Sequence, residues 1–455
     1  MSTSLKKLLI LPVLGTTVFL LGVARPTEPL LVPSPSASAR AFVDGGATDA
    51  HYLDITTSQL QTVLNDPDNR IPEDFKVPAG VRPIVGFWLK IYAKYSLYHT
   101  LIYDRDNHDK IYEVIDNREL FRRGLTPMVL EITSKARINS VIKGYKSAIA
   151  QLERNPKMSF KAGTPGATLV STWGRVSKKE WRRIAEAIRT QTGQRDRIME
   201  GLASADRFFP AMEAIFKKMG IPEVITRLPL VESSFNLNAH SKAAAVGVWQ
   251  FLEKSAQEYL VVDSHNKIDE RLSPIKSTYA AARMFKRNHK LLGDWGLAII
   301  AYNHGPKNLI PIRKKFGGQK ITELLRMTER TPLGYASRSF YACFLAALHA
   351  EKYRDQLYGN TRTPHPDAIS IVKMKKPASV FEIASLYNIS IHELRVFNPD
   401  IFDLKRKLPA GTRIVLPRKH GESLVETPRV GPLDSRDKKE RRGIASELEF
   451  IEYIR

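Results

Sequence analysis

The long stretch from Gly220 to about Gly359 constrains the fold most, because one helical pattern follows another along it. Ser273-Pro274 has the residue types favoured at a helix N-cap and in the first turn. Gly293 ends the segment that follows, as expected of a C-terminal cap. The apolar face of that segment is formed by Ala281, Ala282, Phe285, His289 and Leu292. We therefore expect a compact all-α domain over residues 205–358.

Residues 52–204 are expected to form an α-rich accessory region with a few strands. Aromatic and β-branched residues predict a helix near 80–95 and strands near 98–116. Residues 130–155 and 177–219 show helical spacing. In the latter segment, the recurring apolar residues are Trp181, Ile184, Ala185, Ile188, Phe208, Met212, Ile215 and Phe216. No chemical motif is present, so a scaffold or partner-binding role is the simplest interpretation.

The N-terminus has the order of a secretory signal peptide over residues 1–24. Lys6 and Lys7 precede an apolar run that reaches Ala24, where small residues suit cleavage. An uncleaved membrane anchor is the alternative, although the run is at the short end for a span. Residues 25–51, rich in Pro, Ser, Ala and Gly, are expected to be a flexible leader. The protein is thus predicted to be exported to the periplasm or cell envelope.

A small unit over residues 369–417 is predicted after a linker at 359–368. Its pattern is strand–helix–helix–strand, and two Ser-x-x-Glu capping boxes, Ser379 with Glu382 and Ser390 with Glu393, open the helices. The expected shared core is Phe381, Ile383, Ala384, Leu394 and Phe397. A charged tail, 418–455, follows, in which a helix is expected at 439–453.

The charge balance attracts polyanions, because Lys+Arg number 70 against 47 Asp+Glu, a formal net charge of +23. Anionic envelope polymers or a membrane surface could associate weakly with such a chain. Nucleic acid is not an expected partner, since no helix-turn-helix, zinc spacing or aromatic RNA motif accompanies the charge. The single cysteine, Cys343, lies in an apolar run and is expected in the core. Eleven scattered histidines suggest no metal site.

One carboxylate stands out chemically. Glu232 ends an apolar helical stretch that contains Val224, Ile225, Leu228 and Leu230. Such surroundings penalise a carboxylate and favour its neutral, proton-donating form. A carboxylic acid with a raised pKa can protonate the poor leaving group of a glycosidic bond. An exposed glutamate at a helix end is the alternative.

The surrounding motifs resemble the goose-lysozyme-like lytic transglycosylase domain, over about residues 205–350. The resemblance is closest to the membrane-bound lytic murein transglycosylase D type. It rests on motifs that follow one another in the expected order, namely Glu232-Ser233-Ser234-Phe235, Ala239-x-Ser241, Ala245-x-Gly247-x-x-Gln250-Phe251, Ser255-Ala256, Asp269-Glu270-Arg271, Ser277-Thr278 and Ala301-Tyr302-Asn303-x-Gly305.

This resemblance implies a cofactor-free, non-hydrolytic cut of peptidoglycan between N-acetylmuramic acid and N-acetylglucosamine. Glu232 would act as general acid and then as base, leaving 1,6-anhydro-muramoyl ends. Gln250 would line the glycan groove and Tyr302 would lie near Glu232. Ser241 and Asn303 would be groove or supporting residues, whereas helix capping is the favoured role of Ser233.

The sequence allows two roles for each of two side chains, and more than one reaction. Trp249 could stack on a sugar or fill the core, and His304 could contact substrate or be solvated. A lysozyme-like hydrolase needs a second carboxylate to activate water, for which Asp263, Asp269 and Glu270 are the nearby candidates. A non-catalytic peptidoglycan-binding envelope protein is a further possibility.

The C-terminal unit is similar to a LysM domain, a glycan-binding module. The similarity rests on Ile383-Ala384, Asn398-Pro399 and the run Pro409-Ala410-Gly411-Thr412. It departs from the usual pattern at Pro377-Ala378, where such modules carry Gly-Asp beside the glycan groove. The LysM-like fold is therefore better supported than tight glycan binding.

Overall fold

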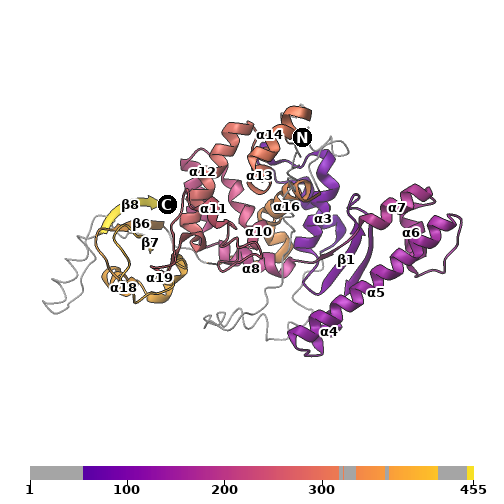
Figure 1. Cartoon of the computed structure of the whole chain (residues 1–455), viewed down its shortest axis with the longest axis horizontal. Helices are drawn as coiled ribbons and strands as arrows, with labels where there is room; N and C mark the ends of the chain where they lie inside the picture. Colours follow the sequence, from indigo (N-terminus) through magenta and orange to yellow (C-terminus); the bar gives the residue numbers. More distant parts are fainter. Residues whose placement is uncertain (1–54, 317–320, 322–334, 364–367, 419–447, 455) are drawn as a thin grey trace, which may run out of the picture.

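The computed structural model describes residues 55–316, 321, 335–363, 368–418 and 448–454. Three parts lie side by side in Figure 1: a central helical body, a lobe built along the long helix α5, and a small C-terminal unit. Helices dominate the described residues and the sheets are small. The mainly α class, with a few strands before the helical domain and a small α/β unit after it, is confirmed.

The central body surrounds one buried core to which both N-terminal and later helices contribute. Helix α3 is buried on almost every side and packs against α16, so residues 55–93 share the core of the predicted catalytic domain. The helices of the body are α2 (Thr57–Asn65), α3 (Arg82–Ala93), α8 (Arg195–Ala205), α9 (Phe209–Lys218), α10 (Leu228–Ser233), α11 (Glu253–Ala256), α12 (Pro274–Leu292), α13 (Trp295–His304), α14 (Pro306–Phe316), α16 (Tyr335–Lys352) and α17 (Arg354–Tyr358). Short 3-10 turns and one two-stranded ladder complete it, namely η2 (Glu73–Phe75), η3 (Ala79–Val81), η4 (Glu223–Arg227), η5 (Glu270–Leu272), β4 (Val262–Asp263) and β5 (Ile268–Asp269).

Helix α12 begins and ends where its sequence predicts. The Ser273 hydroxyl accepts a hydrogen bond from the Lys276 amide, Pro274 occupies the first turn, and Gly293 caps the end with φ 68°. Cys343 is fully buried in α16, as expected.

The lobe has a core of its own, formed where α5, α6 and α7 cover a three-stranded antiparallel sheet of order β2-β1-β3. Its elements are β1 (His99–Asp104), β2 (Ile111–Asp116), α4 (Arg118–Arg122), α5 (Pro127–Arg154), α6 (Pro165–Trp173), α7 (Lys178–Ala187) and β3 (Ile188–Thr192). The strands predicted near 98–116 and the helices predicted near 80–95 and 130–155 are confirmed. The helical interpretation of Ile188 is wrong, because Ile188, Thr190 and Thr192 are β-branched and pair along β1.

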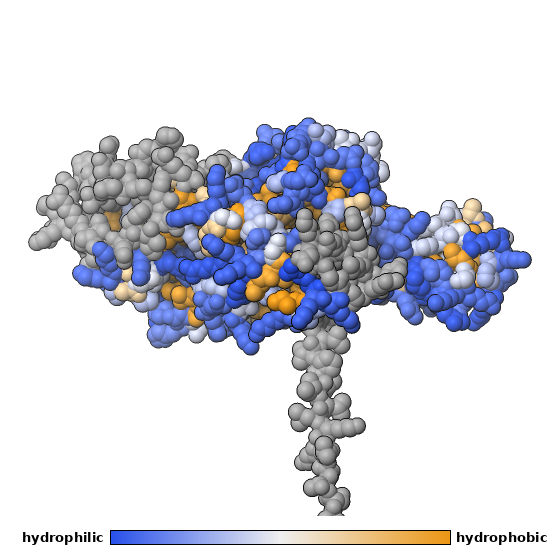
Figure 2. Space-filling model, turned by 90° about the horizontal axis from the view of Figure 1, so that it is seen from above, coloured by the Kyte–Doolittle hydropathy of each residue, from blue (hydrophilic) through white to orange (hydrophobic). Residues whose placement is uncertain are grey.

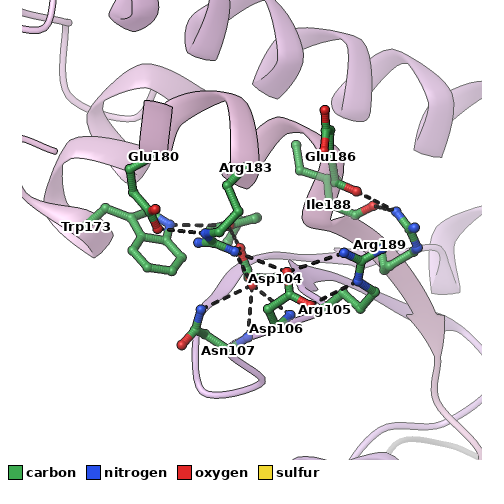
Figure 3. Close-up of polar contacts among 11 residues, drawn as sticks. Asp104, Arg105, Asp106, Asn107, Trp173, Glu180, Arg183, Glu186, Ile188 and Arg189 are labelled. Atoms are coloured by element: carbon green, nitrogen blue, oxygen red, sulfur yellow. Dashed lines mark hydrogen bonds and ion pairs between the residues drawn. The ribbon is translucent and has the colours of Figure 1, made fainter. Parts of the chain in front are cut away.

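A buried carboxylate fastens the lobe's hairpin to α7 (Figure 3). Asp104, fully buried at the end of β1, accepts the amides of Asp106 and Asn107, each at 2.8 Å. It also accepts the Tyr112 hydroxyl and Arg183 Nη1 of α7, each at 3.2 Å. Because each charge is paired or hydrogen-bonded, this network is a structural joint.

The C-terminal unit has the predicted strand–helix–helix–strand order: β6 (Ala368–Met374), α18 (Val380–Tyr387), α19 (Ile391–Phe397) and β7 (Arg413–Arg418). Both bonds of the capping box form at Ser379, whereas the Ser390 hydroxyl accepts only the Glu393 amide. Phe381 is 44% exposed and does not join the predicted core. On α18 it lies about 100° from Val380, and Val380, Ile383 and Ala384 form the buried face.

The end of the chain forms a strand where a helix was expected. β8 (Leu448–Ile454) pairs antiparallel with β6, so the sheet has the order β7-β6-β8. The helix predicted at 439–453 is therefore wrong over its described part. Without β8, strand β6 would be an edge strand with unpaired backbone groups, and pairing with β8 satisfies those groups.

The face seen in Figure 2 is mostly hydrophilic, with hydrophobic residues in separate small areas. No helix among the described residues is long and apolar enough to cross a membrane. The predicted signal peptide, the leader and part of the linker lie outside the described residues.

Candidate active site

Glu232 lies in the last turn of α10, a short helix that follows η4 directly. Its chain neighbours Val231 and Ser233 are buried, and Glu232 itself is half-buried. Ser234 and Phe235 then take left-handed conformations, with φ of 50° and 53°, so the helix stops immediately after the carboxylate. Two consecutive left-handed residues are unfavourable unless tertiary contacts hold them.

Helix α8 supports this turn from behind. A Cβ atom on Gly201 would lie 2.3 Å from the carbonyl oxygen of Ser234, so only glycine permits the approach. The backbone that ends α10 is thus held against another helix.

Burial, without any charged partner, sets the protonation of Glu232. Desolvation raises the pKa of Glu232 to about 8. Among the described residues it has no hydrogen-bond or ion-pair partner, so nothing compensates for the lost hydration. At neutral pH the carboxyl group is therefore mainly protonated and able to donate.

A buried arginine anchors the chain just before α10. Arg227 donates through Nε and Nη2 to the two carboxylate oxygens of Glu351, both at 3.1 Å, and is paired with Glu213. Sequence reasoning missed this cluster because Glu351 lies far along the chain, in α16. The available signal in the sequence was a glutamate that closely follows the apolar run 340–348.

Ser233 links α10 to the loop over residues 239–251. Its buried hydroxyl lies within hydrogen-bond distance of the carbonyl oxygens of Pro229, at 3.1 Å, and Val248, at 3.0 Å. Both acceptors are in the protein, so the structural interpretation of Ser233 fits this geometry.

The loop presents Gln250 and Ser241 at a partly exposed surface. Gln250 has φ 50°, and its side-chain amide donates to the carbonyl oxygen of Gly247 at 2.8 Å. Its Oε1 atom has no partner among the described residues and can accept a hydrogen bond from a ligand. The Ser241 hydroxyl accepts the Ala245 amide at 2.9 Å and so shapes the turn.

Tyr302 of α13 is the residue that links the loop to the aromatic core. Its ring stacks on Phe285 with centroids 5.1 Å apart, and its hydroxyl donates to the carbonyl oxygen of Trp249 at 2.6 Å. Burial, and then the charge of Glu232, raises the pKa of Tyr302 well above its usual value. The expected proximity of Tyr302 and Glu232 agrees with this electrostatic interaction.

Trp249 is a core residue. It is fully buried, and its indole N–H donates a hydrogen bond to Thr278 Oγ1 at 2.9 Å. Its ring stacks on that of Phe216, with the ring centroids 5.8 Å apart. The core interpretation of this side chain is therefore confirmed, and it is not exposed for stacking on a sugar.

Asn303 and His304 form the last turn of α13, before Gly305 with φ 80°. Both are half-buried. Asn303 has no side-chain partner among the described residues and is available to a ligand. Burial lowers the pKa of His304.

The three other carboxylates considered for catalysis are each engaged elsewhere. Asp263 accepts the amide and side chain of Asn266 at 2.9 and 2.7 Å. Asp269 pairs with Arg271 at 2.7 Å, and Glu270 is buried between Lys276 and Arg413. In the described parts of the chain no cluster of His, Cys, Asp and Glu could hold a metal ion.

The short helix with its half-buried acid, the Gly247–Phe251 loop and the tyrosine near the end of α13 all lie inside one matched family region. Residues 210–325 match the transglycosylase SLT domain. Glu232, Ser241, Gln250, Tyr302 and Asn303 all lie within the matched residues.

Two curated relatives resemble the chain over a larger region. They are membrane-bound lytic murein transglycosylase D of Escherichia coli strain K12 and of Escherichia coli O6:H1 strain CFT073. Each is 29% identical over 216 residues, which covers 46% of this chain and 46% of the relative. The chain thus spans about half the length of the curated relatives it matches.

Proposed function

We propose that this protein is a peptidoglycan lytic transglycosylase with Glu232 as its single acid/base. The observation that carries the proposal is the half-buried carboxyl group of Glu232, whose pKa is raised to about 8 without any charged partner. It lies within the SLT domain, and the relatives are named as murein transglycosylases. An acid that is protonated near neutral pH suits departure of a sugar alcohol.

In the first step, Glu232 donates its proton to the glycosidic oxygen between N-acetylmuramic acid and N-acetylglucosamine. The C1–O bond breaks, the N-acetylglucosamine hydroxyl leaves, and positive charge develops at the muramoyl anomeric carbon. Glu232 is then a carboxylate, the form that stabilises this charge.

In the second step, the Glu232 carboxylate accepts the proton of the muramoyl 6-hydroxyl, whose oxygen attacks the anomeric carbon. A 1,6-anhydro ring closes, the acid is regenerated and no water or cofactor is consumed. One carboxyl group therefore serves both steps.

Hydrolysis is the weaker alternative. An inverting or retaining hydrolase requires a second carboxylate beside the bond. Asp263, Asp269 and Glu270 are occupied by Asn266, Arg271 and the Lys276–Arg413 pair. This occupation favours the one-acid mechanism.

We assign the substrate contacts to the loop and to the end of α13. Gln250 Oε1 and the Asn303 amide supply the hydrogen bonds that hydroxyl and acetamido groups need. Tyr302 orients the loop through Trp249, Ser241 shapes the turn, and Ser233 ties that loop to α10.

The export signal and the LysM-like unit fit a cell-envelope enzyme whose partner is the glycan strand. We propose that the +23 charge adds weak attraction to anionic envelope surfaces.

Digestion of purified sacculi, followed by mass spectrometry, tests the function. We expect wild-type protein to release muropeptides with anhydromuramoyl ends, which are about 18 Da lighter than hydrolysis products because no water is added across the cleaved bond. Glu232→Gln should lower the rate by at least about 100-fold, because the amide cannot donate a proton. Glu253→Gln, at an exposed position of α11, is the matched control and should retain wild-type activity.

Reducing ends in the products would favour the hydrolase. If wild-type protein bound sacculi without releasing glycan, the chain would be a non-catalytic binding protein.

A further inference from the structure

The segment over residues 267–272 touches the C-terminal unit on one side. Phe402 donates its amide to the carbonyl oxygen of Lys267 at 3.0 Å, and Asp269 donates to that of Asp400 at 2.9 Å. Ile268 is buried in the core of the C-terminal unit, although it lies in the helical body's sequence. The two parts therefore share backbone hydrogen bonds and a hydrophobic core.

Four charges close this junction. Lys276 Nζ lies 2.6 Å from Asp400 Oδ2 and 3.8 Å from Glu270 Oε1, and all three side chains are buried. Arg413 of β7 donates from Nε to Glu270 at 3.1 Å. Two cations and two anions balance, so the cluster tolerates burial only while both parts remain together.

On its other side, the same segment contacts the loop over residues 239–251, which we call the active-site loop. Arg271 donates from Nη2 and Nε to Asp269 at 2.7 and 2.9 Å, which fixes the guanidinium plane. Its Nη1 reaches the carbonyl oxygens of Ala244, at 3.3 Å, and Phe251, at 3.5 Å. One arginine thus contacts two separate positions, Ala244 and Phe251, of the loop that carries Gln250.

The backbone contact on this side is equally close. A Cβ atom on Gly247 would lie 2.0 Å from the carbonyl oxygen of Arg271. Any shift of residues 267–272 must therefore move the loop or break these contacts.

We propose that residues 267–272 couple the C-terminal unit to the active-site loop, with Arg271 as the positioning residue through which this coupling acts. The LysM-like unit is then part of the support of the active site and not a freely tethered module. The kinetic part of this inference rests on the proposed function.

Amide hydrogen exchange on the full chain tests the coupling without relying on catalysis. Arg413→Met removes the charge that β7 contributes to Glu270. The control is Lys373→Met, which removes the same charge from the paired position on β6, where Lys373 is exposed. We expect exchange in residues 241–251 to be about tenfold faster in Arg413→Met and unchanged in Lys373→Met. Faster exchange confined to residues 368–418 would overturn the coupling.

Steady-state kinetics on soluble glycan strands tests the role of Arg271. Arg271→Met should lower kcat/KM about 10- to 100-fold, mainly through a higher KM, because the loop that contacts glycan loses charged hydrogen bonds. Arg271→Lys keeps the charge and should recover part of the loss. An Arg271→Met protein that is folded and has wild-type kcat/KM would overturn the assignment.

The two measurements separate the inference from the function on which it rests. If wild-type protein released no glycan, the proposed function would fail while the exchange experiment still decided the coupling. If Arg271→Met did not fold, Arg413→Met, at a partly exposed position, would supply the kinetic test with an expected loss of about threefold to tenfold.

Discussion

At the scale of single residues, Glu232 owes its protonation to position. A nearby anion could also raise its pKa, but desolvation is the cause here. The charge of Glu232 acts on Tyr302 electrostatically, whereas the Tyr302 hydroxyl donates its hydrogen bond to the carbonyl oxygen of Trp249. An acid whose pKa is raised by burial needs no partner group that would have to move before the proton is transferred.

The pH dependence of kcat/KM should report this pKa. The active form of the free enzyme has Glu232 protonated, so activity is expected to be constant below about 8 and to fall about tenfold per pH unit above it. Rates measured from about pH 4 to about 9.5 on glycan strands check this. A fall that begins near the ordinary glutamate pKa of 4.5 would contradict it.

The same shift predicts how stability varies with pH. The pKa of Glu232 is about 8 in the folded protein and near 4.5 when unfolded, so the unfolded state releases the proton first as pH rises. The group therefore destabilises the fold increasingly from about pH 4.5 to 8. Glu232→Gln should melt at the same or a higher temperature than wild type, with a larger difference at pH 8 than at pH 5. Thermal unfolding at the two pH values checks this, with Glu253→Gln as control.

At the scale of elements, the short helix α10 is held by its neighbours. Six residues form too little helix to be stable alone. Arg227 anchors its start, Ser233 ties its end to Val248, and Gly201 of α8 lies against the turn that follows. The position of the Glu232 carboxyl group thus depends on packing between α8, α10 and the loop over residues 239–251.

Gly201→Ala should disturb this packing. The new Cβ would meet the carbonyl oxygen of Ser234 at 2.3 Å, so the helix or the turn must shift. We expect a loss of about 2–4 kcal/mol in the free energy of unfolding, together with reduced kcat. Gly86→Ala in α3 is the control, since its Cβ would meet only Leu64 at 3.5 Å. Urea unfolding of both variants gives the comparison; equal stability of the two would count against the steric argument.

At the scale of the whole molecule, the parts differ in how firmly they are joined. The lobe has its own core along α5, whereas the C-terminal unit places Ile371, Phe397 and Val415 in the core of the helical body. The Phe397 ring also packs edge-to-face against that of Phe208, with the ring centroids 5.3 Å apart. We expect the C-terminal unit and the helical body to unfold together.

The buried pair between Lys276 and Asp400 offers a test of that junction. Lys276→Met alone leaves Asp400 unpaired and should cost about 3–5 kcal/mol. The double variant Lys276→Met/Asp400→Leu removes both charges and should recover much of this loss. Denaturant unfolding of the single and double variants measures the coupling, and purely additive losses would contradict a direct ionic interaction.

The helical domain, the hairpin, the strand–helix–helix–strand unit and the candidate acid could all be predicted from local patterns. Ser273-Pro274 and Gly293 mark their helix because caps act within a few residues. Glu232 could be identified from its apolar neighbours and from the order of the motifs after it. These features depend on short-range interactions between residues that are close together in the sequence.

Only the tertiary structure decided which distant segments share a core. Helix α3 joins the core of the central helical body, Ile188 starts a strand beside β1, and β8 completes the sheet of the C-terminal unit. The anchoring of Arg227 by Glu351 and the junction at Lys276 and Asp400 likewise join residues far apart along the chain. Hydrophobic burial and charge pairing depend on proximity in space, so no local pattern encodes these partners.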